Sequence, residues 1–136
     1  MPQPLDRLRE LSAMLDPALL SQLVEVLPDA ILVINREGQI VLVNTQCELL
    51  FGYHRDDLLG KVVEVLLPES MREPHRGFRD RFFADPRVRP MGSGQVLPGL
   101  HRDGSALALD INLSPLISRE GVYAVAVLRR RAVHGA

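Results

Sequence analysis

The pattern of apolar and polar residues divides the chain into a leucine-rich start and a strand-rich remainder. In the start, leucines recur at helical spacing between charged residues, at Leu5, Leu8, Leu11 and Leu15. Asp16 and Pro17 then supply a good N-cap and a favoured first helical residue for a further apolar face that reaches Leu27. We therefore predict two short helices, or one kinked helix, over residues 4–27. Their apolar face has two interpretations, packing on the chain's own domain or contact with a second copy.

Two runs of β-branched residues follow and predict a hairpin. They cover residues 30–35 and 39–44 and enclose a turn that contains Gly38. Further along, alternation of apolar with small or polar residues predicts a half-buried strand, its apolar positions being Leu107, Leu109, Ile111 and Leu113. Shorter strands are predicted over residues 94–100 and 122–128. Because hairpins link antiparallel strands, we expect an antiparallel sheet with the intervening helices on one face.

The middle of the chain is predicted to be mainly helical. Residues 45–51 have helical character, and Gly52 ends this short helix. The apolar run at residues 62–67 fits a helix or a strand equally well. Pro74 can begin a further helix that runs to about residue 84, where Asp85-Pro86 ends it.

Composition and charge narrow the class of protein. The 136 residues are 46% hydrophobic and 24% charged, which is typical of one soluble globular domain. A net charge of -1 provides no overall electrostatic attraction to nucleic acid or to an anionic membrane. The single cysteine, Cys47, excludes an internal disulfide and a cysteine-rich zinc site. Without a signal peptide or a membrane-length apolar run, we expect a cytoplasmic protein.

His75 is the leading candidate for a binding residue. It shares one face of its predicted helix with Phe78 and Phe82, because these residues follow it by three and seven positions. A neutral imidazole that projects into an apolar cavity is a common ligand of a metal centre. The competing interpretation is a histidine that is hydrogen-bonded within the core. We expect no enzyme, since the sequence has no nucleophile motif, phosphate loop or zinc spacing.

In their order, the elements and several short motifs resemble a PAS domain over about residues 27–128. The motifs are Pro28-Asp29-Ala30-Ile31, Gly38-Gln39-Ile40, Asn44, Leu50-Phe51-Gly52-Tyr53, Asp57-Leu58-Leu59-Gly60-Lys61, Arg102-Asp103-Gly104-Ser105 and Leu113-Ser114-Pro115-Leu116. The resemblance implies a PAS fold of the α+β (α/β) class, in which helices on one face of a five-stranded antiparallel sheet enclose a pocket. It also implies a sensory and dimerisation module, which such families join to histidine kinases, diguanylate cyclases or transcription factors.

Residues 68–104 are most similar to the haem-binding PAS domains of the rhizobial oxygen sensors, the FixL type. By that resemblance His75 would ligate the iron of a haem b group, and Arg81 falls on an arginine of the haem pocket helix. Ile111 and Leu113 fall on apolar residues over the distal haem face. Gln95 stands where that family has an arginine that hydrogen-bonds oxygen, and it can donate a hydrogen bond but carries no charge, so this chain departs from the family's oxygen switch at that position. The candidate cofactor-binding residues are therefore His75, Phe78, Arg81, Phe82, Gln95, Ile111 and Leu113.

A flavin is not expected in this chain. The light-sensing PAS domains carry an Asn-Cys-Arg-Phe-Leu-Gln motif that is absent from this sequence, and the sequence also has no tryptophan. Cys47 is instead interpreted as a small buried residue.

The sequence thus predicts an N-terminal amphipathic helical cap over residues 1–27, a PAS domain over 28–131 and a tail over 132–136. We expect a sensory module of a bacterial sensor kinase, cyclase or two-component regulator, which senses a small ligand or relays a signal through dimerisation. The alternatives are a haem-binding gas or redox sensor with His75 as axial ligand, and a cofactor-free dimerisation scaffold. The expected partners are a second copy, bound through the N-terminal helices and the sheet, and an effector domain, with no nucleic acid or membrane.

Overall fold

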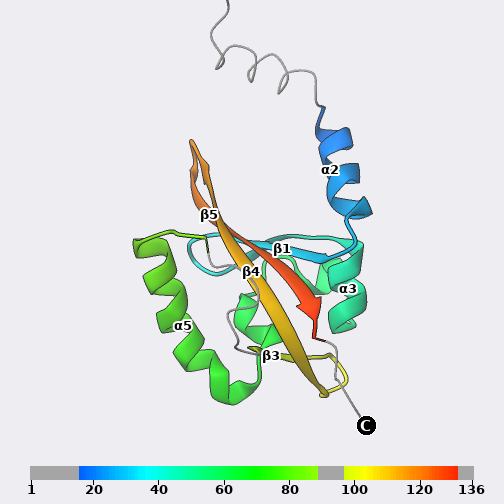
Figure 1. Cartoon of the computed structure of the whole chain (residues 1–136), viewed down its shortest axis with the longest axis vertical. Helices are drawn as coiled ribbons and strands as arrows, with labels where there is room; N and C mark the ends of the chain where they lie inside the picture. Colours follow the sequence, from blue (N-terminus) through cyan, green and yellow to red (C-terminus); the bar gives the residue numbers. More distant parts are fainter. Residues whose placement is uncertain (1–15, 89–96, 132–136) are drawn as a thin grey trace, which may run out of the picture.

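A single antiparallel sheet organises the computed structural model of the chain, which describes residues 16–88 and 97–131 (Figure 1). Its five strands lie in the order β2-β1-β5-β4-β3. Their bounds are β1 Ala30–Ile34, β2 Ile40–Val43, β3 Leu97–Leu100, β4 Ala106–Ser118 and β5 Gly121–Arg130. The predicted α+β architecture, with a five-stranded antiparallel sheet, is confirmed.

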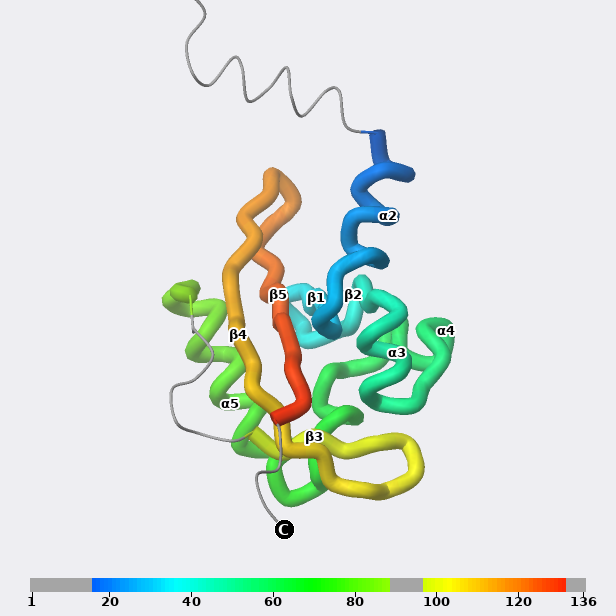
Figure 2. Tube along the Cα trace, turned by 45° about the vertical axis from the view of Figure 1, so that its right-hand side comes forward, coloured from blue at the N-terminus to red at the C-terminus, as the bar shows by residue number. Residues whose placement is uncertain are grey.

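The helices form a layer against one face of this sheet (Figures 1 and 2). They are α3 Thr45–Phe51, α4 Arg55–Leu58, the 3-10 helix η1 Val63–Leu66 and α5 Glu69–Ala84. In Figure 2, α3 and α4 lie at one end of this layer and α5 lies at the other. The hydrophobic core between the layers includes Phe51 and Leu58 from the helical side and Leu32, Leu107 and Leu109 from the sheet, all buried.

The predicted β1–β2 hairpin is present and depends on Gly38 for its turn. Val33 pairs with Leu42 across the two strands. Gly38 has a φ of 82°, in the left-handed region that favours glycine. Its N–H donates to the carbonyl of Asn35, which closes the turn. The turn therefore holds the backbone of residues 35–38 in one defined conformation.

β1 and β5 are antiparallel neighbours, so the start of β1 lies beside the end of β5. Ala30 pairs with Leu128. Just beyond this pair, the guanidinium of Arg129 donates to both carboxylate oxygens of Asp29, at 2.9 and 3.1 Å. The start of β1 and the end of β5 are thus held together by backbone pairing and by this side-chain contact.

α5 begins earlier than the sequence pattern indicated. It starts at Glu69, with Pro68 as the N-cap, and Pro74 lies inside it, so the predicted start at Pro74 is wrong. Pro74 has no N–H to donate to the carbonyl of Ser70, but its fixed φ is compatible with a helix. Burial of Phe82 and Phe83 at the far end of α5 favours keeping the helix continuous across this missing bond.

The ambiguous apolar run before α5 is resolved as a short 3-10 helix. This is η1, and it is preceded by an isolated bridge between Val62 and Gln39. The run therefore contributes one turn of helix and one bridge to the β1–β2 turn region. The carboxylate of Glu64 is buried within it, at 1% exposure.

A helix before the sheet, α2 Pro17–Val26, extends away from the rest of the molecule (Figures 1 and 2). Asp16 caps it as predicted, accepting a bond from the N–H of Leu19 at 2.7 Å. None of its residues is buried. The predicted helical positions 4–15 lie outside the described residues. In the described part of the chain, every helix is too short or too polar to span a membrane.

The C-terminal end of α2 is attached to the sheet and helices by polar contacts. The side-chain amide of Asn44, which is fully buried, donates to the carbonyls of Val24 and Asp29 at 3.1 and 3.0 Å. The carboxylate of Glu25 accepts from Arg55 at 2.8 Å and from the N–H of Thr45 at 3.0 Å. These contacts hold one end of α2 and leave its apolar side chains uncovered.

Candidate functional site

A cavity of about 700 Å³ lies between α5 and the inner face of the sheet. Apolar side chains from every strand except β2 line most of it. On β5 its wall consists of Ala124 and Ala126, whose short side chains leave room, and of Leu128. Its size is within the range of small-molecule and cofactor sites, and its apolar lining with a few polar groups matches their usual chemistry.

His75 is the cavity residue whose ring has a charged partner in the core. It lies on α5, and its Nδ1 is 2.6 Å from the Oε2 of Glu64. The second carboxylate oxygen of Glu64 is 3.1 Å from the guanidinium of Arg79, one turn further along α5. The Nε2 of His75 has no hydrogen-bond partner among residues 16–88 and 97–131. His75 is therefore hydrogen-bonded in the core, as one of the two interpretations predicted, and it also lines a cavity, whereas its ligation of a haem iron stays a prediction.

The other predicted site residues on α5 separate into two groups. Phe78 and Arg81 line the cavity, and the rings of Phe78 and His75 lie 6.1 Å apart between centroids. Phe82 does not border the cavity. It is 3% exposed and packs in the core, edge-on to Phe83. The expected role of Phe82 as a cavity residue is thus corrected, because the face of α5 that carries His75 turns from the cavity into the core along its length.

The predicted residues beyond α5 lie on β4 or outside the described residues. Ile111 and Leu113 both line the cavity from the inner face of β4. They alternate with Asp110 and Asn112, as the sequence pattern indicated. Gln95 lies outside the described residues.

The two charged residues that contact each other beside His75 were missed by sequence reasoning. Glu64 and Arg79 were assigned no role, although together with His75 they form the charged cluster that borders the cavity. A signal was present at Glu64, which is the one charged residue in the apolar run at 62–67. A lone carboxylate in such a run must either reach solvent or find a buried partner.

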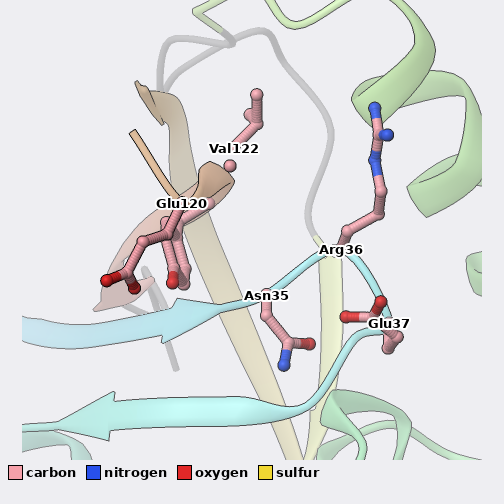
Figure 3. A pocket seen from close by; sticks show the side chains of 7 residues that line it. Asn35, Arg36, Glu37, Glu120 and Val122 are labelled. Carbon is pink, nitrogen blue, oxygen red and sulfur yellow. The ribbon is translucent and has the colours of Figure 1, made fainter. Parts of the chain in front are cut away.

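A smaller hollow of about 360 Å³ lies between the β1–β2 turn and the β4–β5 turn. Figure 3 shows that the side chains of Asn35, Arg36 and Glu120 point in different directions instead of converging. Asn35 bonds to Gln39, and Arg36 donates to the carbonyl of Phe83 on α5. These polar groups therefore serve the turns, and the cavity beside α5 is the better candidate site.

Cys47 is buried in the core, as predicted. Burial raises the pKa of its thiol to about 12, with a smaller contribution from the nearby charge of Glu48. The thiol is therefore protonated at neutral pH and is a poor nucleophile or metal ligand.

Two curated sensor proteins are similar to this chain in sequence. The sensor protein FixL of Bradyrhizobium diazoefficiens is 29% identical over 117 residues, which cover 85% of this chain and 23% of that protein. The oxygen sensor protein DosP of Escherichia coli is 26% identical over 100 residues, which cover 74% of this chain and 12% of that protein. The chain thus spans about a quarter or less of the length of these two relatives.

Two solved structures share the fold of this chain, and a family model matches most of its length. The PAS domain of an HTR-like protein from Haloarcula marismortui superposes with a TM-score of 0.65 at 23% identity, covering 93% of this chain and 96% of that one. A PAS domain from Colwellia psychrerythraea gives a TM-score of 0.71 at 21% identity, covering 84% of this chain and 95% of that one. The family model described as the PAS fold matches residues 18–131. The chain belongs to the PAS family.

Proposed function

We propose that this chain is the sensory module of a larger signalling protein and reports whether the cavity beside α5 is occupied. The observation that carries the proposal is an apolar cavity of about 700 Å³ bordered by one histidine with a buried carboxylate partner. The names of the two curated relatives, a sensor protein and an oxygen sensor protein, support a sensory role. We propose a non-catalytic role for the module itself, with any enzymatic output supplied by another domain.

The occupant that these residues fit best is a haem group. His75 supplies an imidazole of the kind that binds haem iron, and its Nδ1 partner is the carboxylate expected behind a metal-ligating histidine. Arg81 borders the same cavity and supplies a cation for acidic groups of the ligand. Ile111 and Leu113 supply an apolar wall on β4. When bound, haem would provide an iron centre that takes up a small gas molecule or changes its oxidation state.

A spectroscopic titration tests this proposal. Purified chain is titrated with hemin, and the Soret band is recorded for the wild type, His75→Ala and His54→Ala. His54 is the matched control, because its side chain is 66% exposed and caps α4, which contributes no residue to the cavity. We expect saturable one-to-one binding by the wild type and His54→Ala, and a loss or a shift of the Soret band in His75→Ala. Absence of a Soret band in the wild type, or an unchanged band in His75→Ala, would contradict His75 ligation.

The signal would leave the module through its dimer contact. We propose a homodimer that uses α2 and the outer face of the sheet, and an effector domain that responds to a shift between two arrangements of the module. What supports α2 as the contact is its row of exposed leucines, Leu19, Leu20 and Leu23, which are 46–55% exposed. Uncovered apolar side chains on a helix that extends from its domain are typical of an interaction surface.

The dimer contact also supports the second candidate function, a cofactor-free scaffold. Sedimentation analysis tests whether α2 forms the dimer contact. It compares the double variant Leu20→Asp/Leu23→Asp with Ser21→Asp on the same helix. We expect the leucine variant to be monomeric and the serine variant to keep the wild-type mass. A dimer that survives in the leucine variant would exclude α2 as the contact. Dimerisation together with no hemin binding would favour the scaffold over the haem sensor.

A further inference from the structure

Glu64 is a charged group in the core and therefore needs compensation. Its side chain is 1% exposed, and an uncompensated carboxylate at such a position costs several kcal/mol. Two neighbours on α5 supply the compensation. The guanidinium of Arg79 lies 3.1 Å from Oε1, and the Nδ1 of His75 lies 2.6 Å from Oε2.

The charges in this cluster are already balanced without a charge on His75. Arg79 is permanently protonated and offsets the single negative charge of Glu64. A neutral His75 leaves the cluster with no net charge, whereas a protonated ring would leave one positive charge close to the core. A carboxylate can only accept a hydrogen bond, so the Nδ1 of the neutral ring must carry the proton. The other ring nitrogen, Nε2, then keeps its lone pair.

We propose that Glu64 is a positioning residue of the cavity, which fixes His75 as the Nδ1–H tautomer and makes Nε2 the nitrogen that faces a ligand. The ligand class follows from this tautomer. Nε2 with a free lone pair binds a metal centre or a hydrogen-bond donor and repels a hydrogen-bond acceptor. The assignment of the ligand class rests on the proposed sensory function, whereas the tautomer of His75 does not.

Arg79, the second partner of Glu64, is held by the β1–β2 turn. Its guanidinium donates to the carbonyl of Glu37 at 3.0 Å and lies directly over Gly38. A Cβ atom at Gly38 would be 1.1 Å from one guanidinium nitrogen of Arg79, so any larger residue there displaces this side chain. The turn therefore contributes to the geometry of His75 through two intermediate side chains.

The tautomer can be measured directly on the ligand-free full chain. Long-range ¹H–¹⁵N correlation spectra near neutral pH distinguish protonated from unprotonated ring nitrogens, and His75→Gln assigns the signal. We expect His75 of the wild type to show a protonated Nδ1 and an unprotonated Nε2. A predominant Nε2–H tautomer, or protonation of both nitrogens, would overturn the proposal without any variant of Glu64.

Two variants then separate the contributions of Glu64 and the turn. In Glu64→Gln the amide can donate as well as accept, so we expect the tautomer preference of His75 to be lost. Gly38→Ala disturbs the cluster from the turn, by displacing Arg79 and by straining the backbone at a positive φ, and we expect a smaller change of the same sign. Glu48→Gln is the control, because it removes a carboxylate whose partner is Arg55 and not His75. Wild-type His75 signals in Glu64→Gln would overturn the positioning role.

Hemin release distinguishes failure of this inference from failure of the proposed function. The dissociation rate of hemin into excess apomyoglobin is measured for the wild type, Glu64→Gln and Glu48→Gln. We expect release from Glu64→Gln to be roughly tenfold or more faster, as is usual when the partner of a ligating histidine is lost. No hemin binding by the wild type, with the Nδ1–H tautomer present, would reject haem and leave the role of Glu64 intact. Equal release rates from wild type and Glu64→Gln, with binding through His75, would reject the role of Glu64 alone.

Discussion

Two charged clusters in the described part of the chain differ mainly in burial, one pairing an arginine with two carboxylates and the other an arginine and a histidine with one. At the C-terminal end of α2, Arg55 bonds both Glu25 and Glu48. The side chains of these three residues are between 17% and 35% exposed. Beside the cavity, Glu64 is 1% exposed and Arg79 is 12% exposed. Exposed pairs are screened by water and salt and contribute little each, whereas a buried pair is costly to break. The first cluster is therefore suited to an attachment that can change, and the second to a fixed geometry.

The largest expected effect comes from removing the cation of the buried cluster. Arg79→Leu leaves Glu64 with only His75 as a partner, and we expect the free energy of unfolding to fall by about 3 kcal/mol. Urea unfolding monitored by circular dichroism measures this change. The control is Arg76→Leu, because Arg76 is 54% exposed and lies 3.9 Å from Glu73, and its substitution should cost about 0.5 kcal/mol or less. Equal effects of the two substitutions would show that the buried arginine adds no more stability than an exposed one.

A somewhat smaller effect is expected at Asn44, which is the buried part of the α2 attachment. Its side chain accepts from the N–H groups of Ile31 and Cys47 and donates to two carbonyls. Asn44→Ala removes the cap of α3 and leaves buried backbone groups unpaired. We therefore expect the free energy of unfolding to fall by about 2 kcal/mol. Thermal and urea unfolding measure it, and hydrogen exchange should increase along α2. Unchanged exchange in α2 would show that the helix is held by other contacts.

At the exposed cluster, the expected change in stability is smaller still. Arg55→Gln removes the cation shared by Glu25 and Glu48, and we expect the free energy of unfolding to fall by about 1 kcal/mol or less. The more informative measurement is hydrogen exchange, which should rise in α2 while exchange in the sheet stays as in the wild type. Arg87→Gln is the matched control, because its pair with Asp85 does not contact α2. A rise in exchange throughout the sheet would mean that this cluster supports the whole fold.

The smallest expected effect is a dependence of stability on pH. The hydrogen bond from Arg55, followed by that from Thr45, lowers the pKa of Glu25 from its ordinary 4.5 to about 2. Because the folded-state pKa is the lower one, this carboxylate adds stability above pH 4.5, and the contribution is lost as the pH falls from 4.5 toward 2. Urea midpoints across this range should fall less in Glu25→Gln than in the wild type. High salt should reduce the difference, since the pair is partly exposed.

The sheet and the location of His75 followed from local patterns in the sequence. β-branched runs around Gly38 and the alternation through Ile111 and Leu113 depend only on neighbouring residues, so they could be read directly. Helical periodicity placed His75 and Phe78 on one face, and both line the cavity. The same periodicity included Phe82, because it cannot show where along a helix the neighbouring surface changes from cavity to core.

The charged cluster could not be derived from the sequence because its partners come from separate elements. Glu64 lies on a 3-10 turn within a run that fits a helix or a strand, and Arg79 is one of several arginines on a helix whose start was misplaced at Pro74. Pairing between them depends on how η1 packs against α5. A buried carboxylate is visible in a sequence as an anomaly, but its partner becomes visible only when the fold is known.

The pairing of Ala30 with Leu128 has a consequence for how this module would be joined to other segments of a longer protein. Because α2 leads into β1 at the point where β5 ends, a segment preceding the sheet and one following it would be attached at neighbouring points, where Arg129 bonds Asp29. Adjacent points of attachment allow a domain to be inserted into a host chain without separating the flanking parts of the host. A rotation of α2 would then act close to the first residues of the segment that follows β5.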